Sequence, residues 1–128
     1  MHEKRIEIRW RDMDAFGHVN NSVYLTFLEE ARDEWLEKAL DSPVDTWEFV
    51  VARVAIDFRS PLRQSEGWVL ARCRLDSVGT SSFTTHEELI AADGRVAAEA
   101  ATVMVAIHRG SETSRPLSEG ERSALERA

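Results

Sequence analysis

The sequence predicts a single α+β domain in which one long helix packs on a mainly antiparallel sheet of five strands. Three observations predict this fold. A short alternating segment precedes the chain's only long amphipathic stretch, and four further strand-like segments follow it. The connections between those four segments are too short for parallel strands, which need crossovers of a dozen residues or more. A helix packed on one face of an antiparallel sheet is a stable two-layer arrangement.

The first strand is expected over 4–10, where apolar and charged residues alternate and Ile6, Ile8 and Trp10 share one face. The helix is expected over 22–40. Its apolar residues recur at helical spacing and form one stripe, namely Tyr24, Phe27, Leu28, Ala31 and Trp35. The opposite, solvent-facing side is expected to carry Glu29, Glu30, Arg32, Asp33, Glu34, Glu37 and Lys38.

The two ends of the helix have their own signals. Asn20, Asn21 and Ser22 are residue types that cap a helix N-terminus, because a short polar side chain accepts from free N–H groups. Pro43 ends the helix, because proline disfavours helical geometry in the residue before it.

Four strands are expected to follow, over 49–58, 68–78, 82–91 and 95–108. In the first of them one apolar face is expected, made of Val50, Ala52, Val54, Ile56 and Phe58. A turn or the lead-in to the strand is expected at 45–48, and Asp93-Gly94 is a two-residue hairpin signal. The domain is expected to span 1–110, followed by a polar C-terminal tail over 111–128 that can form a short helix with little apolar face.

Composition and charge exclude several classes of protein. The 128 residues suit one domain, and a net charge of −7 with a pI near 5.1 argues against binding nucleic acid or an anionic membrane. The single cysteine, Cys73, allows no intrachain disulfide and is expected to be a buried apolar residue. No apolar run reaches the roughly 18 residues of a membrane span. The N-terminal residues contain no apolar signal segment, so a cytoplasmic location is expected.

The stretch over 12–24, Asp-Met-Asp-Ala-Phe-Gly-His-Val-Asn-Asn-Ser-Val-Tyr, carries the densest set of chemically capable groups. Asp14 can be a catalytic carboxylate or simply a loop carboxylate near the positive helix N-terminus. For Asp12 the structural reading is favoured. His18 can be a general base, although a loop histidine held by hydrogen bonds is the favoured interpretation. A metal site from Asp12, Asp14 and His18 is disfavoured because their spacing matches no common metal motif.

This stretch, together with Arg11 before it and Glu29 and Arg32 along the helix, resembles the hotdog-fold acyl-CoA thioesterases of the 4-hydroxybenzoyl-CoA thioesterase-like family. Two weaker matches lie at 57–62 and 79–83, and the similarity covers roughly 3–108. The resemblance implies a curved five-stranded antiparallel sheet wrapped around the central helix. It also implies hydrolysis of an acyl-CoA thioester without any cofactor, in a homodimer or homotetramer with active sites at subunit interfaces.

The resemblance also implies roles for particular residues. Asp14 occupies the position of the family's catalytic carboxylate, as nucleophile or general base. Asn21 occupies the helix-start position whose backbone N–H faces the thioester carbonyl, and such an N–H suits a developing oxyanion. Contacts to substrate are expected from His18, Asn20, Tyr24, Arg59, Pro61, Arg63, Gly79, Thr80, Ser81 and Ser82.

The chain departs from the family at 77–82, where many relatives carry a basic residue for the phosphates of CoA and this chain has none. Arg59 and Arg63 are therefore the expected phosphate-binding cations. The departure leaves other interpretations open: a thioesterase for acyl-carrier protein, a dehydratase on the same fold, or a hotdog protein that binds an acyl thioester without cleaving it.

A homo-oligomer is also expected from the residues themselves. One helix cannot cover both faces of a five-stranded sheet, and Trp10, Trp47 and Trp68 add apolar area that needs burial. Stable homodimer interfaces commonly bury 2,000 Å² or more in total.

Overall fold

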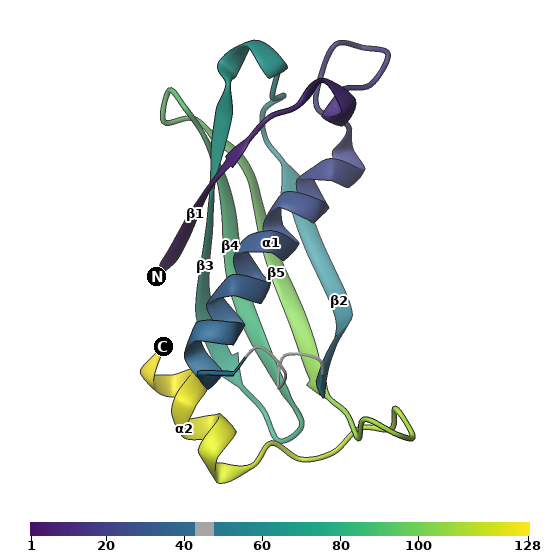
Figure 1. The fold of residues 1–128 in the computed structure, drawn as a ribbon, viewed down its shortest axis with the longest axis vertical. Coiled ribbons are helices and arrows are strands. Elements are labelled where there is room, and N and C mark those ends of the chain that lie inside the picture. Colours follow the sequence, from purple (N-terminus) through teal and green to yellow (C-terminus); the bar gives the residue numbers. More distant parts are fainter. Residues whose placement is uncertain (43–47) are drawn as a thin grey trace.

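The computed structural model describes residues 1–42 and 48–128, and it contains one five-stranded antiparallel sheet with two α-helices (Figure 1). The strand order is β1-β3-β4-β5-β2. The strands are β1 (His2–Glu7), β2 (Phe49–Phe58), β3 (Trp68–Val78), β4 (Ser82–Ala91) and β5 (Val96–Ala106), and the helices are α1 (Asn21–Leu40) and α2 (Glu119–Arg127). The curved sheet wraps around α1, so the predicted α+β hotdog fold is confirmed.

Helix α1 begins and ends close to where its capping residues predict. The Asn20 side chain accepts from the Ser22 N–H at 2.9 Å, which stabilises the first turn. Asp41 at the C-terminal end adopts a left-handed conformation, with φ of 55°, and donates its N–H to carbonyls of the last turn. Pro43, Trp47 and most of the expected 45–48 turn lie outside the described residues.

The expected apolar stripe of α1 is buried against the sheet, and Cys73 is buried beneath it on β3. Two expectations about side-chain placement are wrong. Trp10 does not extend the first strand but begins a 3-10 turn, and its side chain is 79% exposed. Arg32 does not face solvent; it is 4% exposed, because it turns toward the sheet and pairs with buried Glu87 on β4.

Edge strand β2 departs from the expected alternation because it contains a β-bulge between Val51 and Arg53. Directly opposite residues on antiparallel strands point to the same face, and Val54 and Val51 lie opposite the inward-facing Thr102 and Met104 of β5. The bulge therefore places Val51, rather than Val50, on the helix side together with Val54. A period-2 pattern cannot reveal an inserted residue.

The C-terminal segment forms α2, which docks at the C-terminal end of α1 (Figure 1). Ser118 caps the helix, since its hydroxyl accepts from the Glu121 N–H at 3.0 Å and the Glu121 carboxylate accepts from the Ser118 N–H at 2.8 Å. The apolar face of α2 is small, as expected, since Leu125 is its one buried residue; Leu125 is fully buried, and Leu117 just before the helix is nearly so. Within the described ranges, neither helix is long and apolar enough to cross a membrane.

Candidate active site

The loop that leads into α1 is folded tightly by its own backbone. The Asp14 N–H donates to the His18 carbonyl at 2.8 Å, and the Gly17 N–H donates to the Asp14 carbonyl at 3.1 Å. Gly17 has φ of 79°, a conformation that side-chain-bearing residues rarely adopt. The loop therefore holds residues 14–18 in one compact turn directly before the helix.

The two aspartates of the motif differ in burial and in the backbone N–H groups from which they accept. Asp12 is buried, and its Oδ2 accepts from the Arg9 N–H at 2.8 Å, which caps the 3-10 turn Trp10–Asp12. Asp14 is half-buried, and its Oδ1 accepts from the Phe16 N–H at 2.9 Å and from the His18 N–H at 3.4 Å. No described residue donates to the other Asp14 oxygen, Oδ2, which leaves that oxygen available for a ligand or water.

The first turn of α1 offers one backbone donor beside Asp14. The N–H of Ser22 is taken by the Asn20 side chain, and the N–H of Val23 by the Asn20 carbonyl at 2.9 Å. The N–H of Asn21 has no acceptor among the described residues. It lies at the N-terminus of a 20-residue helix, where the partial positive charge of the helix dipole favours a developing negative charge.

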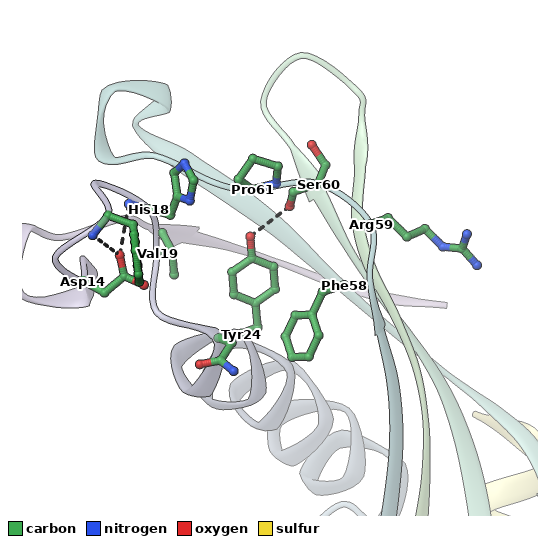
Figure 2. Close-up of a pocket in the computed structure, with 10 residues that line it drawn as sticks. Asp14, His18, Val19, Tyr24, Phe58, Arg59, Ser60 and Pro61 are labelled. Atoms are coloured by element: carbon green, nitrogen blue, oxygen red, sulfur yellow. Dashed lines mark hydrogen bonds between the residues drawn. The ribbon is translucent and has the colours of Figure 1, made fainter.

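Asp14 and Asn21 line the same cavity, of about 440 Å³, at the N-terminal end of α1 (Figure 2). Tyr24 forms its inner wall, packs edge-on against Phe58 with ring centroids 5.3 Å apart, and donates its hydroxyl to the Ser60 carbonyl at 2.9 Å. Burial raises the pKa of the Tyr24 phenol, which keeps it a hydrogen-bond donor. Pro61 completes this side of the cavity.

The expected cations take different positions around the cavity. The Nη2 of Arg63 lies 3.0 Å from the Nε2 of His18, and because a guanidinium only donates, Nε2 is the acceptor in this contact. Arg59 lines the cavity, but its guanidinium points away from Asp14 (Figure 2) and pairs with Glu99 at 2.6 Å. Asn20 contributes its side chain to the helix cap.

The second expected binding segment, 79–82, lies at the end of the folded domain opposite the loop that precedes α1 (Figure 1). It forms the β3–β4 turn, and an 11-residue strand of about 36 Å separates it from the loop that carries Asp14. Its carbonyls are held by the C-terminal segment: Leu117 donates its N–H to Thr80 at 2.9 Å, and Arg122 donates Nη2 to Gly79 at 2.7 Å. A single chain does not bring Gly79, Thr80, Ser81 and Ser82 together with Asp14.

Sequence reasoning missed several residues of this neighbourhood. Phe16, Val19, Phe58 and Ser60 line the cavity, and Phe16 is 85% exposed on the motif loop. A large aromatic residue inside a polar motif was the available sequence signal for Phe16. Arg122 was missed because its contact with the β3–β4 turn joins residues 43 positions apart. In the described ranges, no three His, Cys, Asp or Glu side chains gather as a metal site would require.

Comparisons with known proteins show which family the chain is similar to. The family model of the thioesterase-like superfamily matches residues 8–125. The long-chain acyl-CoA thioesterase FadM of Escherichia coli (strain K12) is 31% identical over 109 residues, covering 82% of each chain. The acyl-acyl carrier protein thioesterase ATL3 of Arabidopsis thaliana is 32% identical over 73 residues, covering 54% of this chain and 38% of the plant protein.

Among solved structures, a thioesterase from Thermus thermophilus in complex with coenzyme A and Zn superposes with a TM-score of 0.90 at 29% identity. The superposition covers 98% of this chain and 92% of that one. The likeness therefore includes the loop before α1, the sheet and both helices rather than an isolated motif.

Proposed function

Because the chain belongs to the thioesterase-like superfamily and is a thioesterase, we propose that it hydrolyses acyl-CoA to the free acid and CoA, with Asp14 as the catalytic carboxylate. One observation carries the proposal: a carboxylate oxygen without a protein donor and a helix N–H without a protein acceptor, both judged over the described residues, line the same cavity. The first suits attack or proton removal, and the second suits the carbonyl oxygen that gains charge.

The reaction needs only these groups and water. The thioester carbonyl oxygen accepts from the Asn21 N–H, which stabilises the tetrahedral adduct at the carbonyl carbon. In one route Asp14 removes a proton from a water that adds to that carbon. In the other, Asp14 itself adds and forms an acyl anhydride, which water then hydrolyses. In both routes the C–S bond breaks and CoA leaves as a thiolate that takes up a proton.

We further propose that the working unit is a homo-oligomer, a dimer or a tetramer, assembled first through the free edge of β2. Within the described sheet this strand pairs only with β5, and Val50, Val51, Val54 and Phe58 are exposed along it. An open apolar edge favours pairing with another strand. An oligomer would also allow the 79–82 turn and Arg122 of one subunit to approach the cavity of another.

A panel of acyl-CoAs with a thiol-detecting reagent tests the reaction, and acyl-carrier-protein thioesters and 3-hydroxyacyl-CoAs extend it. Release of free thiol from acyl-CoAs is the expected result. Release from the carrier-protein substrates alone would identify the carrier as protein, the substrate class in the name of the plant relative. Formation of an enoyl product without thiol would identify a dehydratase. Binding of acyl-CoA with no turnover would identify a non-catalytic binding protein.

The Asp14→Asn substitution tests the carboxylate. Asparagine can still accept from the Phe16 N–H, so the loop should fold, but the charge and basicity are lost. We expect kcat to fall at least about 100-fold, the lower end of what one positioned base contributes, with Tm nearly unchanged.

Asp12→Asn is the matched control, because it also keeps an acceptor for its own backbone partner, the Arg9 N–H. It should retain most of the activity, although its buried side chain makes some loss of Tm expected. Equal losses of kcat in the two variants would mean that the catalytic carboxylate is misassigned, and His18 would be the next candidate.

A further inference from the structure

A second cavity, of about 220 Å³, lies farther along α1, between that helix and β2. Leu25 and Leu28 of α1 line one side and Val51 and Val54 of β2 line the other. Since Phe58 lies against Tyr24 near the start of α1, β2 runs antiparallel to the helix. The first cavity is lined by Asn21 and Tyr24 at the start of α1, and the second by the following turns of the same helix, so an acyl chain directed along α1 from the first cavity approaches the second.

The inner wall of the second cavity is polar, in contrast to its apolar sides. Arg32 and Glu87 both line it, and the Arg32 Nη1 lies 3.2 and 3.0 Å from the two oxygens of Glu87. Thr85 donates its hydroxyl to one of these oxygens at 2.7 Å, and Thr102 donates to the other at 3.0 Å. Each Glu87 oxygen therefore has two donors, so this carboxylate is fully satisfied.

The guanidinium of Arg32 is not satisfied. Its Nε is buried and has no hydrogen-bond partner among the described residues, and none of them accepts from its Nη2. The N–H of Nε and one N–H of Nη2 point the same way along one edge of the planar group, which forms a two-pronged donor. A buried donor without an acceptor calls for a specific explanation, because such a group ordinarily finds a partner.

We propose that this edge of Arg32 binds an oxygen atom on the distal part of the acyl group, so that the preferred substrates are acyl thioesters oxygenated far from the thioester carbon. The inference rests on the proposed hydrolysis. Asn21 and Arg32 are 11 residues apart, which is about 16 Å along the helix. Arg32 leans toward the helix N-terminus by part of this length, and an extended acyl chain spans the remainder.

The local charges define the kind of oxygen. Glu87 already neutralises Arg32, and Glu29 also lines the cavity. Burial, and then the nearby charge of Glu29, raise the pKa of Asp33, in keeping with an excess of carboxylates here. A second carboxylate on the ligand would be repelled, whereas a hydroxyl or keto oxygen accepts from the guanidinium edge without adding charge.

Matched substrates test the proposal on the wild-type enzyme. Straight-chain acyl-CoAs of increasing length are each compared with the same acyl group bearing a terminal hydroxyl and with one bearing a terminal carboxylate. At one chain length the hydroxylated substrate should have a kcat/KM about tenfold or more above the plain one, in line with a hydrogen bond to a charged group. At that length the substrate with the terminal carboxylate should have a lower kcat/KM than the one with the terminal hydroxyl.

The Arg32→Lys variant adds a second readout. Lysine keeps the charge opposite Glu87 but lacks the two-pronged edge, so the ratio of hydroxylated to plain kcat/KM should fall close to one. Arg72→Lys is the control, because Arg72 pairs with Glu3 on the other face of the sheet, and its ratio should not change. Tm measurements identify a variant that fails to fold, in which case the wild-type series decides.

The proposal would be overturned if, at every chain length, the kcat/KM of the plain acyl-CoA equalled or exceeded that of the hydroxylated one. In that case water, and not the substrate, accepts from the Arg32 edge. A preference for the carboxylate series would overturn it too. Both results leave the thioesterase proposal standing. No turnover of any acyl-CoA would instead reject the proposed function, and this inference with it.

Discussion

Two arginines near the loop that carries Asp14 differ in the contacts they already make. Arg63 contacts the His18 ring through its Nη2 and has no carboxylate partner among the described residues, whereas Arg59 pairs with the Glu99 carboxylate at 2.6 Å. Arg63 is therefore the better candidate to meet a phosphate of CoA. We expect Arg63→Glu to raise KM for acyl-CoA by several-fold to about tenfold and to lower kcat much less, because such a contact is present equally in ground and transition states.

Arg59→Glu is the matched comparison and should raise KM less than Arg63→Glu. Steady-state kinetics on one acyl-CoA give both values. If neither variant changes KM, the phosphates lie elsewhere, and Arg122→Glu at the β3–β4 turn becomes the next variant to measure.

At the residue scale, the sequence showed which residues line the candidate site better than it showed which side chains pair with each other. The motif pointed to Asp14 and Asn21, and both line one cavity, although their catalytic roles remain proposals. Arg32 was placed on the wrong side of the helix, because helical spacing alone cannot show that a charged residue has a buried partner. The sequence did contain a sign of this ion pair: Glu87 occupies one of the alternating positions of β4 whose side chains face the core, so it needs a buried partner.

Three kinds of contact hold α2 to the rest of the described chain: the buried Leu125 side chain, the hydrogen bond from Arg122 to the Gly79 carbonyl, and an ion-pair cluster around Arg115 and Glu121. Leu125 is fully buried, so Leu125→Ala should lower the free energy of unfolding by about 2–5 kcal/mol, the usual range for a buried leucine. Leu25→Ala removes the same atoms from a side chain that is 39% exposed and should cost about 1 kcal/mol or less. Urea unfolding of both variants compares them, and similar losses would show that α2 contributes little.

The ion-pair cluster of α2 should make stability depend on pH. Arg115, above all through its hydrogen bond at 2.8 Å, lowers the pKa of the Glu121 carboxyl below its ordinary value of 4.5. A lowered folded-state pKa stabilises the fold above pH 4.5, and the contribution disappears as pH falls through the folded-state value. At neutral pH we expect Glu121→Gln to lose about 1 kcal/mol.

The difference between wild type and Glu121→Gln should narrow as pH falls from about 7 to about 3, because the wild-type carboxyl then becomes neutral as well. Thermal unfolding of both proteins across this range measures the difference. If the difference in Tm between wild type and Glu121→Gln stayed constant with pH, the Glu121 charge would not stabilise α2.

At the scale of elements, the boundaries of β2, β3 and β4 and the end of α1 fall where the sequence predicts. Proline, glycine and capping residues end helices and strands through their own backbone preferences, so these boundaries can be predicted from short segments of sequence. The bulge of β2 depends on pairing with β5, which is distant in the sequence, and this is why alternation misjudged the inward face of β2.

For the whole molecule, assembly is the property most open to measurement. Light scattering at micromolar concentration should give a mass of two or four chains of 14.5 kDa. Val50→Asp adds a charge to an exposed position of the β2 edge, where a two-fold contact would bring two such charges together. We expect this variant to shift toward the monomer. A monomeric wild type would contradict both the assembly and a site shared between subunits.

The fold class was the most predictable property of the molecule. One strand, one long helix and four closely connected strands leave few topologies, and the observed sheet order follows from pairing neighbouring hairpins and closing β2 and β1 onto the two edges. The sequence could not show that 79–82 lies at the opposite end from Asp14, since a motif match carries no distance between its parts.

The buried pair of Arg32 and Glu87 restricts how this sequence can drift over time. Replacing either residue alone leaves one charge in the interior without its counterpart, a change that costs about 3–5 kcal/mol, whereas replacing both with apolar residues of similar volume can be neutral. Descendants should therefore keep both residues or exchange them together, with few surviving intermediates. A deep mutational scan would show this as strong positive epistasis between positions 32 and 87, two sites separated by 55 residues of chain.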